Sequence, residues 1–413
     1  MVRQFSLASF LGNASPPARP SCLSGCRKVY EVLALLKDQF LLDPDLVFLN
    51  HGSFGACPRP VFETYQRWQR ELEQQPVEFL GRRAVDLLAQ ARARLAEYLG
   101  VAARDVVYFP NPTTALNMVA RSLKLRPGDE ILTTDHEYGA MDRTWRFVCR
   151  KTGARYVRHP IPLPVTTHEE FVETLWSGIT ARTRVVFISH ITSPTALTFP
   201  VQEICRRARQ SGLLSIVDGA HAPGQIPLNL GEIGADFYAG ACHKWLCAPK
   251  GAAFLYARRE VQEWLEPLVV SWGWESEEPS DSQFVDYHEW QGTRDLAAFL
   301  SVPAAIEFQA QHDWAAVQRR CHELARETRW RLTGLTSLPP ICPDSPEWFA
   351  QMAAARLPDI DLDRLKKRLY DEFRIEVPLI EWNGQQLIRV SFQVYNSRAD
   401  IDALLDALMS VIC

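Results

Sequence analysis

A lysine and an aspartate each follow an apolar stretch of this chain, and as a pair they suit covalent chemistry with an aldehyde cofactor. Lys244 comes shortly after the apolar segment Ala235–Ala241, and Asp218 ends another apolar segment that begins at Leu213. Burial disfavours the charged form of a lysine and so leaves an amine that can form a Schiff base. An aspartate can hold a protonated pyridine nitrogen. The pair predicts pyridoxal 5'-phosphate chemistry, while a surface lysine and a helix-capping aspartate are the alternative for either residue alone.

The segment Phe109–Asn117 (FPNPTTALN) is a second candidate site. It follows an apolar strand and opens a helix, so free backbone N–H groups and the positive end of the helix dipole face one place. Thr113 and Thr114 add hydroxyl donors, which predicts a phosphate-binding site. An ordinary threonine helix cap is the alternative. The chain has neither a P-loop nor a GxGxxG motif, which argues against ATP and dinucleotides.

Three further side chains have types that suit such a site. His221 follows Asp218 by three residues and could hydrogen-bond a ring hydroxyl. Tyr138 follows a strand in the segment DHEY, where it could stack on a cofactor ring or pack in the core. Arg389 lies between apolar residues in IRVSF, and its planar guanidinium suits an amino-acid carboxylate. A salt bridge to an aspartate or glutamate is the alternative for Arg389.

Short apolar segments alternate with helical patterns along the first three quarters of the chain. This alternation predicts an α/β fold with a mostly parallel sheet that is covered on both faces. The expected strands are 106–109, 130–133, 154–159, 184–188, 213–217, 235–241 and 252–257. The expected helices include 60–74, 84–99, 114–123, 141–151, 168–176, 201–210 and a helical region from 296 to 335.

The strands and helices after residue 300 predict a second, smaller unit. Strands are expected at 353–357, 375–379 and 387–392, with helices at 361–373 and 399–412. The predicted organisation is a disordered extension or targeting segment (1–27), an N-terminal segment that packs on the small domain (28–55), a large cofactor-binding α/β domain (56–300) and a small α+β domain (301–413).

Composition indicates an ordinary soluble protein. Of 413 residues, 47% are hydrophobic and 23% charged, and the net charge is −4, so we expect neither nucleic acid nor a membrane as a partner. The ten cysteines lack metal-ligand spacing, which favours free, mostly buried thiols in a reducing cytoplasm. The first 30 residues contain no acidic residue and three arginines, as transit peptides do, so organelle targeting is an alternative to a plain extension.

Taken together, the motifs resemble the class V aminotransferase family of fold-type I pyridoxal phosphate enzymes, in its isopenicillin-N-epimerase-like branch. The resemblance runs in order from Phe48 to Leu408 and is carried by FLNHGSFGACPRPV, NPTTALN, DHEYGAM, VDGAHAPG, CHKWLCAPKG, SWGW, EWQGTRD and IRVSFQVYN. It implies a homodimer, because Gly292-Thr293 resembles the segment that reaches the phosphate of the neighbouring subunit.

The resemblance also implies roles for single residues. Lys244 becomes the Schiff-base lysine and Asp218 the partner of the ring nitrogen, and Arg389 binds the substrate carboxylate. The other implied cofactor contacts are Thr113 and Thr114 at the phosphate, Tyr138 as the ring-stacking residue with His136 as its alternative, His190 and His221 near the ring hydroxyl, His243 before the lysine, and Thr293.

Two departures from the family pattern narrow the reaction. Ala241 stands where related enzymes have a serine, so one phosphate contact must come from elsewhere. Cysteine desulfurases carry a catalytic cysteine shortly before the arginine, and residues 371–378 contain none, which disfavours the persulfide mechanism.

The resemblance implies an enzyme that acts at the Cα of an amino acid or its derivative, through an aldimine and a quinonoid intermediate. Lys244 would be the general base. Epimerisation would need a second acid, such as Tyr138 or a histidine. A β-lyase that cleaves a C–S bond and an aminotransferase are the alternatives, and a non-catalytic pyridoxal-phosphate-binding protein is another.

Overall fold

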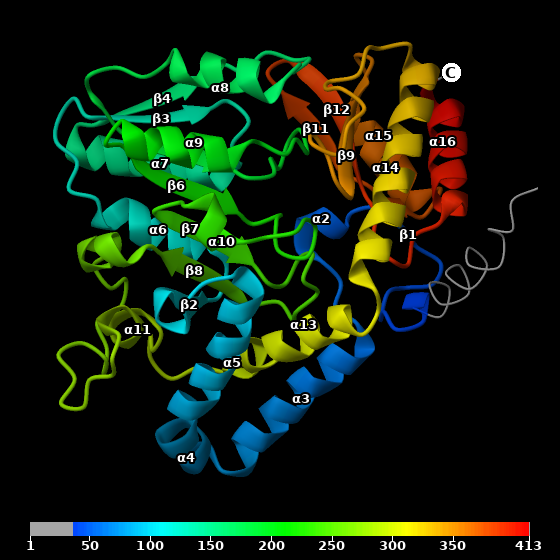
Figure 1. The fold of residues 1–413 in the computed structure, drawn as a ribbon. Helices are drawn as coiled ribbons and strands as arrows, with labels where there is room; N and C mark the ends of the chain where they lie inside the picture. The colour runs from blue at the N-terminus through cyan, green and yellow to red at the C-terminus, as the bar shows by residue number, and fades with distance from the viewer. Residues whose placement is uncertain (1–35, 413) are drawn as a thin grey trace, which may run out of the picture.

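A seven-stranded sheet forms the centre of the larger part of the molecule (Figure 1). The computed structural model describes residues 36–412, so the predicted extension 1–27 lies outside the described residues. The strand order is β2-β8-β7-β6-β5-β3-β4, and every neighbouring pair is parallel except the two that include β8. The strands are β2 (Val106–Phe109), β3 (Glu130–Thr134), β4 (Arg155–His159), β5 (Thr183–Ser189), β6 (Leu214–Gly219), β7 (Phe237–Ala241) and β8 (Ala253–Ala257).

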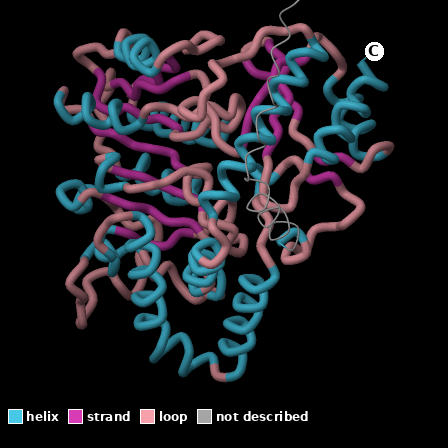
Figure 2. Tube along the Cα trace, turned by 45° about the vertical axis from the view of Figure 1, so that its right-hand side comes forward, coloured by secondary structure: helices cyan, strands magenta, loops and turns pink. Residues whose placement is uncertain are grey.

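Helices cover both faces of this sheet because its strands are apolar on both sides (Figure 2). In β2, Tyr108 belongs to one buried cluster and its neighbours Val107 and Phe109 to the other, as the alternation of side chains along a strand requires. One face packs on α6 (Pro112–Ser122) and α7 (Gly139–Thr152). The other face packs on α5 (Ala84–Leu99), α8 (His168–Trp176) and α9 (Val201–Gln210).

A smaller sheet lies beside the large one, drawn in orange and red in Figure 1. Its antiparallel order is β11-β12-β9, and β1 forms a separate parallel pair with β10. The N-terminal strand β1 is thereby joined to the C-terminal part of the chain. The elements are β1 (Val47–Phe48), β9 (Met352–Leu357), β10 (Ile375–Glu376), β11 (Leu379–Trp382), β12 (Gln385–Ser391), α14 (Trp314–Thr336), α15 (Leu362–Asp371) and α16 (Arg398–Ile412).

Helices that precede and follow the large sheet pack on one another at its lower end in Figure 1. Helices α12 (Ala297–Leu300) and α13 (Val302–Ala310) contact both α3 (Arg59–Gln74) and α5, so helices from before and after the large sheet pack together. The remaining α-helices of the described residues are α2 (His51–Phe54), α4 (Pro76–Glu78), α10 (Leu230–Ile233) and α11 (Gln283–His288).

The structure resolves one predicted helical region into its separate helices and divides one predicted strand. The helical region 296–335 is three helices, since Pro303 begins a new helix at α13 and Asp313, with φ +42°, caps α14. The predicted strand 375–379 breaks after Glu376, because Pro378 has no N–H to give to a ladder.

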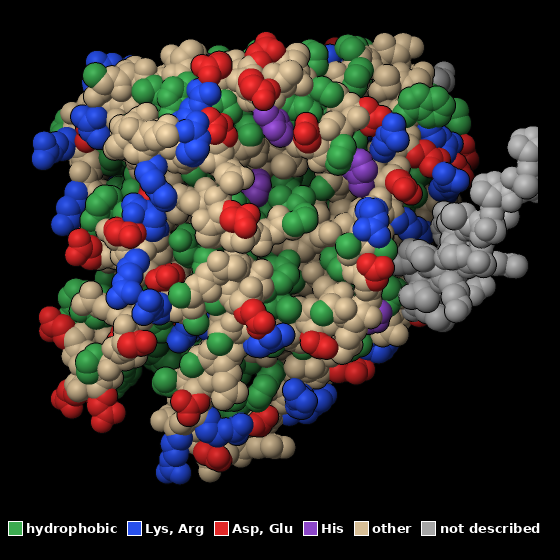
Figure 3. Space-filling model, viewed as in Figure 1, with side chains coloured by type: hydrophobic (Ala, Val, Ile, Leu, Met, Phe, Trp, Pro, Cys, Tyr) green, Lys and Arg blue, Asp and Glu red, His purple; other side chains and the backbone are tan. Residues whose placement is uncertain are grey.

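The surface carries both signs of charge. On the face shown in Figure 3, acidic and basic side chains mingle over most of the area. None of the helices within residues 36–412 has the length and apolar character needed to cross a membrane.

Candidate active site

The candidate site lies where β5, β6 and β7 end, because the carboxyl ends of parallel strands meet at one edge of a sheet. In the register of these strands, Ser189 pairs with Asp218 and Gly219 pairs with Gly240. His190 follows β5 directly, and Lys244 follows the end of β7 by three residues. The structure therefore brings the predicted lysine and aspartate together.

Lys244 has an amine of unusual acidity for a lysine. Burial lowers the pKa of Lys244 to about 8, and the positive charge of Arg389 acts in the same direction while Asp218 opposes it. Its Nζ lies 3.2 Å from Nε2 of His221. A substantial fraction of the amine is therefore neutral near physiological pH, as a nucleophile or a proton acceptor requires.

Asp218 is a buried carboxylate without a cationic partner in direct contact. Its Oδ1 accepts a hydrogen bond from the N–H of Ala220 at 3.0 Å, and it forms no salt bridge within residues 36–412. Burial raises the pKa of Asp218 above its ordinary value. Because an isolated buried carboxylate is costly, this site suits a ligand that brings its own positive charge, such as a protonated ring nitrogen.

His190 and His221 both lie next to this pair as neutral rings. The backbone N–H of His190 donates to the backbone carbonyl of Asp218 at 2.8 Å. The ring Nδ1 of His190 lies 2.8 Å from the hydroxyl of Tyr238. Burial lowers the pKa of His190 to about 4 and holds that of His221 well below its ordinary value. Neutral imidazoles can hydrogen-bond a ring hydroxyl without adding charge to the site.

Arg389 reaches the site from β12 of the small sheet and is 4% exposed. One guanidinium nitrogen donates to the carbonyl of Ser193 at 2.5 Å and lies 3.2 Å from its hydroxyl, and the other is 3.2 Å from the hydroxyl of Ser53. Its Nε has no partner within residues 36–412, and no described carboxylate pairs with it. The salt-bridge alternative is therefore absent from the described structure, and the guanidinium suits a carboxylate supplied by a ligand.

The N-terminal turn at α2 touches the lysine directly. Nε2 of His51 lies 3.1 Å from the carbonyl oxygen of Lys244, and Nδ1 lies 2.9 Å from the hydroxyl of Tyr395. Gly55 has φ +70° and ψ 168°, and a Cβ at this position would lie 2.1 Å from the carbonyl oxygen of His243. Only glycine fits this close approach. The glycine in the motif FLNHGSFG is a sequence signal of this close approach, but the sequence alone gives no role for His51 or Ser53.

Replacing Gly55 with alanine should lower the thermal stability of the protein sharply. The backbone angles of Gly55 are almost exclusive to glycine, and the added methyl group would collide with backbone, so we expect a loss of about 3 kcal/mol or more. Gly384→Ala is the matched control, because Gly384 also has positive φ (+71°) but open space around its Cβ position. It should cost about 1 kcal/mol. Equal melting temperatures for the two variants would contradict the tight packing at Lys244.

The predicted phosphate site lies at the start of α6, and its two threonines differ. Asn111 is the cap of this helix, and its Oδ1 accepts from both the N–H (2.8 Å) and the hydroxyl (3.0 Å) of Thr114. The hydroxyl of Thr113 makes no hydrogen bond within the described chain. Thr113 is therefore the threonine that is free to donate to a phosphate.

The segment Asp135–Tyr138 separates into buried and exposed side chains. His136 is fully buried, with Nδ1 2.8 Å from the hydroxyl of Thr195 and Nε2 2.9 Å from the carbonyl of Ile161, so both its nitrogens are engaged. Tyr138 is 46% exposed at the start of α7, and its hydroxyl bonds no residue in the described range. This geometry favours Tyr138 over His136 as the residue that faces a ligand.

Glu137 is a buried carboxyl group beside the site to which the sequence reasoning gave no role. It accepts hydrogen bonds from the backbone N–H (2.9 Å) and the hydroxyl (2.6 Å) of Ser189, and lies 2.7 Å from the hydroxyl of Thr134. Burial raises the pKa of Glu137 to about 8, and the charge of Asp218 adds to the rise. A carboxyl in the middle of a polar tetrapeptide gives no sequence signal of such burial.

The other predicted residues lie around the lysine turn or apart from it. Nδ1 of His243 lies 3.0 Å from the carbonyl of Ala252 in the turn before β8, and burial lowers the pKa of His243 to about 4. Ala241 is buried at the end of β7. Thr293 is exposed next to Gly292, which has φ +101°. Within residues 36–412, Thr293 forms no side-chain hydrogen bond, and its predicted partner is a second subunit.

A lysine with a lowered pKa and a buried carboxylate without a cationic partner lie at one sheet edge, and a buried arginine reaches them from the small sheet. This arrangement suits a pyridoxal-phosphate-dependent enzyme with an α/β fold. The chain belongs to the aminotransferase class-V family, which matches residues 55–404. The resemblance predicted from the motifs is thereby confirmed.

The chain is also similar to individual proteins over most of its length. It is 40% identical over 386 residues to an isopenicillin N epimerase of Amycolatopsis lactamdurans, covering 90% of this chain and 96% of that protein. A probable chloroplastic L-cysteine desulfhydrase of Arabidopsis thaliana is 29% identical over 406 residues, with coverages of 90% and 84%.

A solved structure gives the same picture of the fold. A variant of the enzyme C-DES, with glycine covalently linked to its PLP cofactor, matches with a TM-score of 0.78 at 22% identity, covering 90% of this chain and 98% of that chain. This likeness confirms the predicted α/β fold.

Proposed function

We propose that this enzyme binds pyridoxal 5'-phosphate at Lys244 and epimerises an amino acid or amino-acid derivative at Cα. When bound, the cofactor supplies an electron sink that stabilises negative charge at Cα. The observation that carries the proposal is a lysine amine with a pKa of about 8 at the same sheet edge as the unpaired buried carboxylate of Asp218. The fit of Asp218 to a protonated ring and of Thr113 to a phosphate supports this cofactor.

The residues of the site have complementary tasks in removing the Cα proton. Arg389 binds the substrate carboxylate through its guanidinium, which has no carboxylate partner in the described residues, and so orients the Cα–H bond. Lys244 then accepts the proton, because much of its amine is neutral near pH 8. Asp218 holds the positive charge at the ring nitrogen, and the neutral His190 and His221 hydrogen-bond the ring hydroxyl.

Epimerisation also needs a proton donor on the opposite face of Cα, and Tyr138 is our candidate. Its phenol is 46% exposed and unbonded in the described structure, so it can turn toward a ligand. The 40% identity to the isopenicillin N epimerase of Amycolatopsis lactamdurans favours this reaction. We further propose that the enzyme is a homodimer in which Thr293 of one subunit contacts the cofactor phosphate in the other subunit. We also propose that it is located in the cytoplasm.

β-Elimination with C–S cleavage is the second candidate, since the Arabidopsis relative is named a probable L-cysteine desulfhydrase. Its first steps would use the same residues. Transamination is a further candidate for this site, because it differs from epimerisation only in that the proton would be delivered to a carbon of the cofactor and not back to Cα. The persulfide mechanism remains disfavoured, because residues 371–378 contain no cysteine.

Proton NMR of the cofactor-loaded protein in D₂O with an amino-acid panel tests the proposal. The panel contains cysteine, S-substituted cysteines and both enantiomers of common amino acids. We expect one member to lose its Cα proton signal while the amino acid stays intact, with chiral analysis showing both configurations. Formation of pyruvate would show that the reaction is β-elimination and would overturn the assignment of epimerisation. Free cofactor without protein is the control, and no exchange above that control for any member would contradict catalysis at Cα.

A further inference from the structure

Trp245, the residue after the lysine, determines which nitrogen of His221 carries the hydrogen. Its indole N–H donates to Nδ1 of His221 at 3.3 Å. An indole nitrogen can only donate, so Nδ1 must be the acceptor in this contact. The single hydrogen of a neutral imidazole then lies on Nε2.

His221 stays neutral over the working pH range. Burial holds the pKa of His221 well below its ordinary value, and positive charges nearby act in the same direction. The charged and titratable groups that face it and contribute to this are Lys244, Arg389, His243 and His51. A doubly protonated ring is therefore excluded near neutral pH, and the tautomer alone decides what Nε2 presents.

The Nε2 hydrogen points at the catalytic amine. Nε2 of His221 lies 3.2 Å from Nζ of Lys244. An ammonium group has three donors and no acceptor, so a protonated Lys244 cannot bond an Nε2–H. The neutral amine has a lone pair and can accept this hydrogen. The contact therefore favours the free amine of Lys244.

We propose that Trp245 is a positioning residue that fixes the Nε2–H tautomer of His221 and thereby keeps Lys244 as the free amine. This inference rests on the proposed role of Lys244 as the residue that reacts with the cofactor. Without the indole N–H, the ring of His221 could carry its hydrogen on Nδ1. Its Nε2 would then accept a charge-assisted hydrogen bond from the lysine ammonium.

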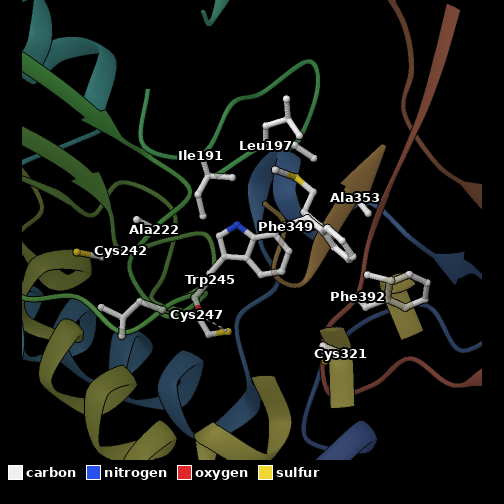
Figure 4. Packing of buried hydrophobic residues seen from close by; sticks show 14 of the residues in the cluster. Ile191, Leu197, Ala222, Cys242, Trp245, Cys247, Cys321, Phe349, Ala353 and Phe392 are labelled. Carbon is white, nitrogen blue, oxygen red and sulfur yellow. Dashed lines mark hydrogen bonds between the residues drawn. The ribbon is translucent and has the colours of Figure 1, made fainter. Parts of the chain in front are cut away.

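The indole is held firmly enough to act in this way. Trp245 is fully buried in the hydrophobic cluster shown in Figure 4, which also includes Ile191 and Phe349. Its ring centroid lies 4.9 Å from that of His51, and its carbonyl accepts from the side-chain amide of Gln309 at 2.8 Å. The donor is thus fixed from both its ring and its backbone.

The chain contains a matched control for this tryptophan. Trp145 is also fully buried, but it lies in the cluster on the other face of the sheet, and its indole nitrogen has no hydrogen-bond partner in the described residues. Trp145→Phe and Trp245→Phe remove the same atoms from a core. Only Trp245→Phe removes a donor to His221.

The test measures how fast the cofactor-free full-length chain captures pyridoxal phosphate as a function of pH. For the unaltered protein, we expect the rate to rise with pH through about 8, as the amine of Lys244 loses its proton. For Trp245→Phe, the midpoint should rise by about one unit, so capture should be about tenfold slower at pH 7 and equal at high pH. Trp145→Phe should follow the unaltered curve, and the pH dependence of the aldehyde itself cancels between variants.

Each outcome separates this inference from the proposed function. An unaltered protein that captures no pyridoxal phosphate would overturn the cofactor assignment. Capture with the same midpoint in Trp245→Phe would overturn the role of Trp245 alone. If Trp245→Phe does not fold, the ¹⁵N shifts of the histidine rings in the unaltered chain decide, with His221→Gln used for assignment. We expect a protonated Nε2 in His221, and a protonated Nδ1 would overturn the inference.

Discussion

Replacing Lys244 with alanine should abolish covalent attachment of pyridoxal phosphate and lower the rate of Cα proton exchange by about 10³- to 10⁴-fold. The variant loses both the nucleophile for the cofactor and the general base for the substrate. Borohydride reduction followed by peptide mass spectrometry measures the attachment. In the unaltered protein, the reduced adduct should lie on the peptide that contains Lys244.

The matched control is Lys250→Ala. Lys250 lies in the turn just before β8, and partial desolvation of its amine lowers its pKa as well. Its amine donates to the carbonyl of Gly55 at 3.0 Å, which engages it structurally. Lys250→Ala should therefore keep the adduct on Lys244 and exchange the Cα proton. An adduct on any other lysine in Lys244→Ala, with exchange retained, would overturn the assignment of the site.

Replacing Arg389 with lysine should weaken the binding of amino acids by about 10- to 100-fold. A lysine cannot reproduce the planar pair of donors that a guanidinium offers to a carboxylate, and a charge-assisted hydrogen bond contributes about 1.5–3 kcal/mol. The loss should appear chiefly in KM. Amines that lack the carboxylate should bind the two proteins equally, and this comparison separates carboxylate recognition from a general disturbance of the site.

Arg329→Lys is the control for this substitution. Arg329 is also buried, but its guanidinium donates to the carbonyls of Cys342 (2.8 Å) and Pro343 (3.3 Å) and lies over the ring of Phe349. Its replacement should lower the melting temperature and leave KM unchanged. If Arg389→Lys weakens amines and amino acids by the same factor, the arginine does not bind the carboxylate.

The strand ends were the predictable part of this site. Strand β6 is apolar except for Ser215 until it reaches Asp218, and β7 is apolar up to the turn of Lys244, so the sequence marked both positions. Parallel strands that are neighbours in a sheet bring their carboxyl ends together, which placed the two residues at one edge without any knowledge of distances. The ends of α5, α8 and α9 were predicted from periodicity for a similar reason, since each has a regular buried face.

Contacts across long stretches of chain could not be predicted. Arg389 bonds Ser53 and Ser193, which are 336 and 196 residues away, and no local pattern relates them. Where two neighbouring residues could play the same role, the sequence could not decide between them. Asn111 and Thr114 can both cap a helix, and the structure shows that Asn111 is the cap and uses both hydrogens of Thr114.

The N-terminal turn at α2 limits how far the large and the small parts of this enzyme can change in sequence independently of each other. It lies at the N-terminal edge of the family match, which begins at residue 55, yet its His51 bridges the lysine carbonyl and Tyr395, and its Ser53 contacts Arg389. The residues proposed for cofactor attachment and for substrate recognition therefore both contact this one N-terminal turn. We therefore expect an exchange of the C-terminal part between relatives to preserve the site only if the matching N-terminal turn is exchanged with it.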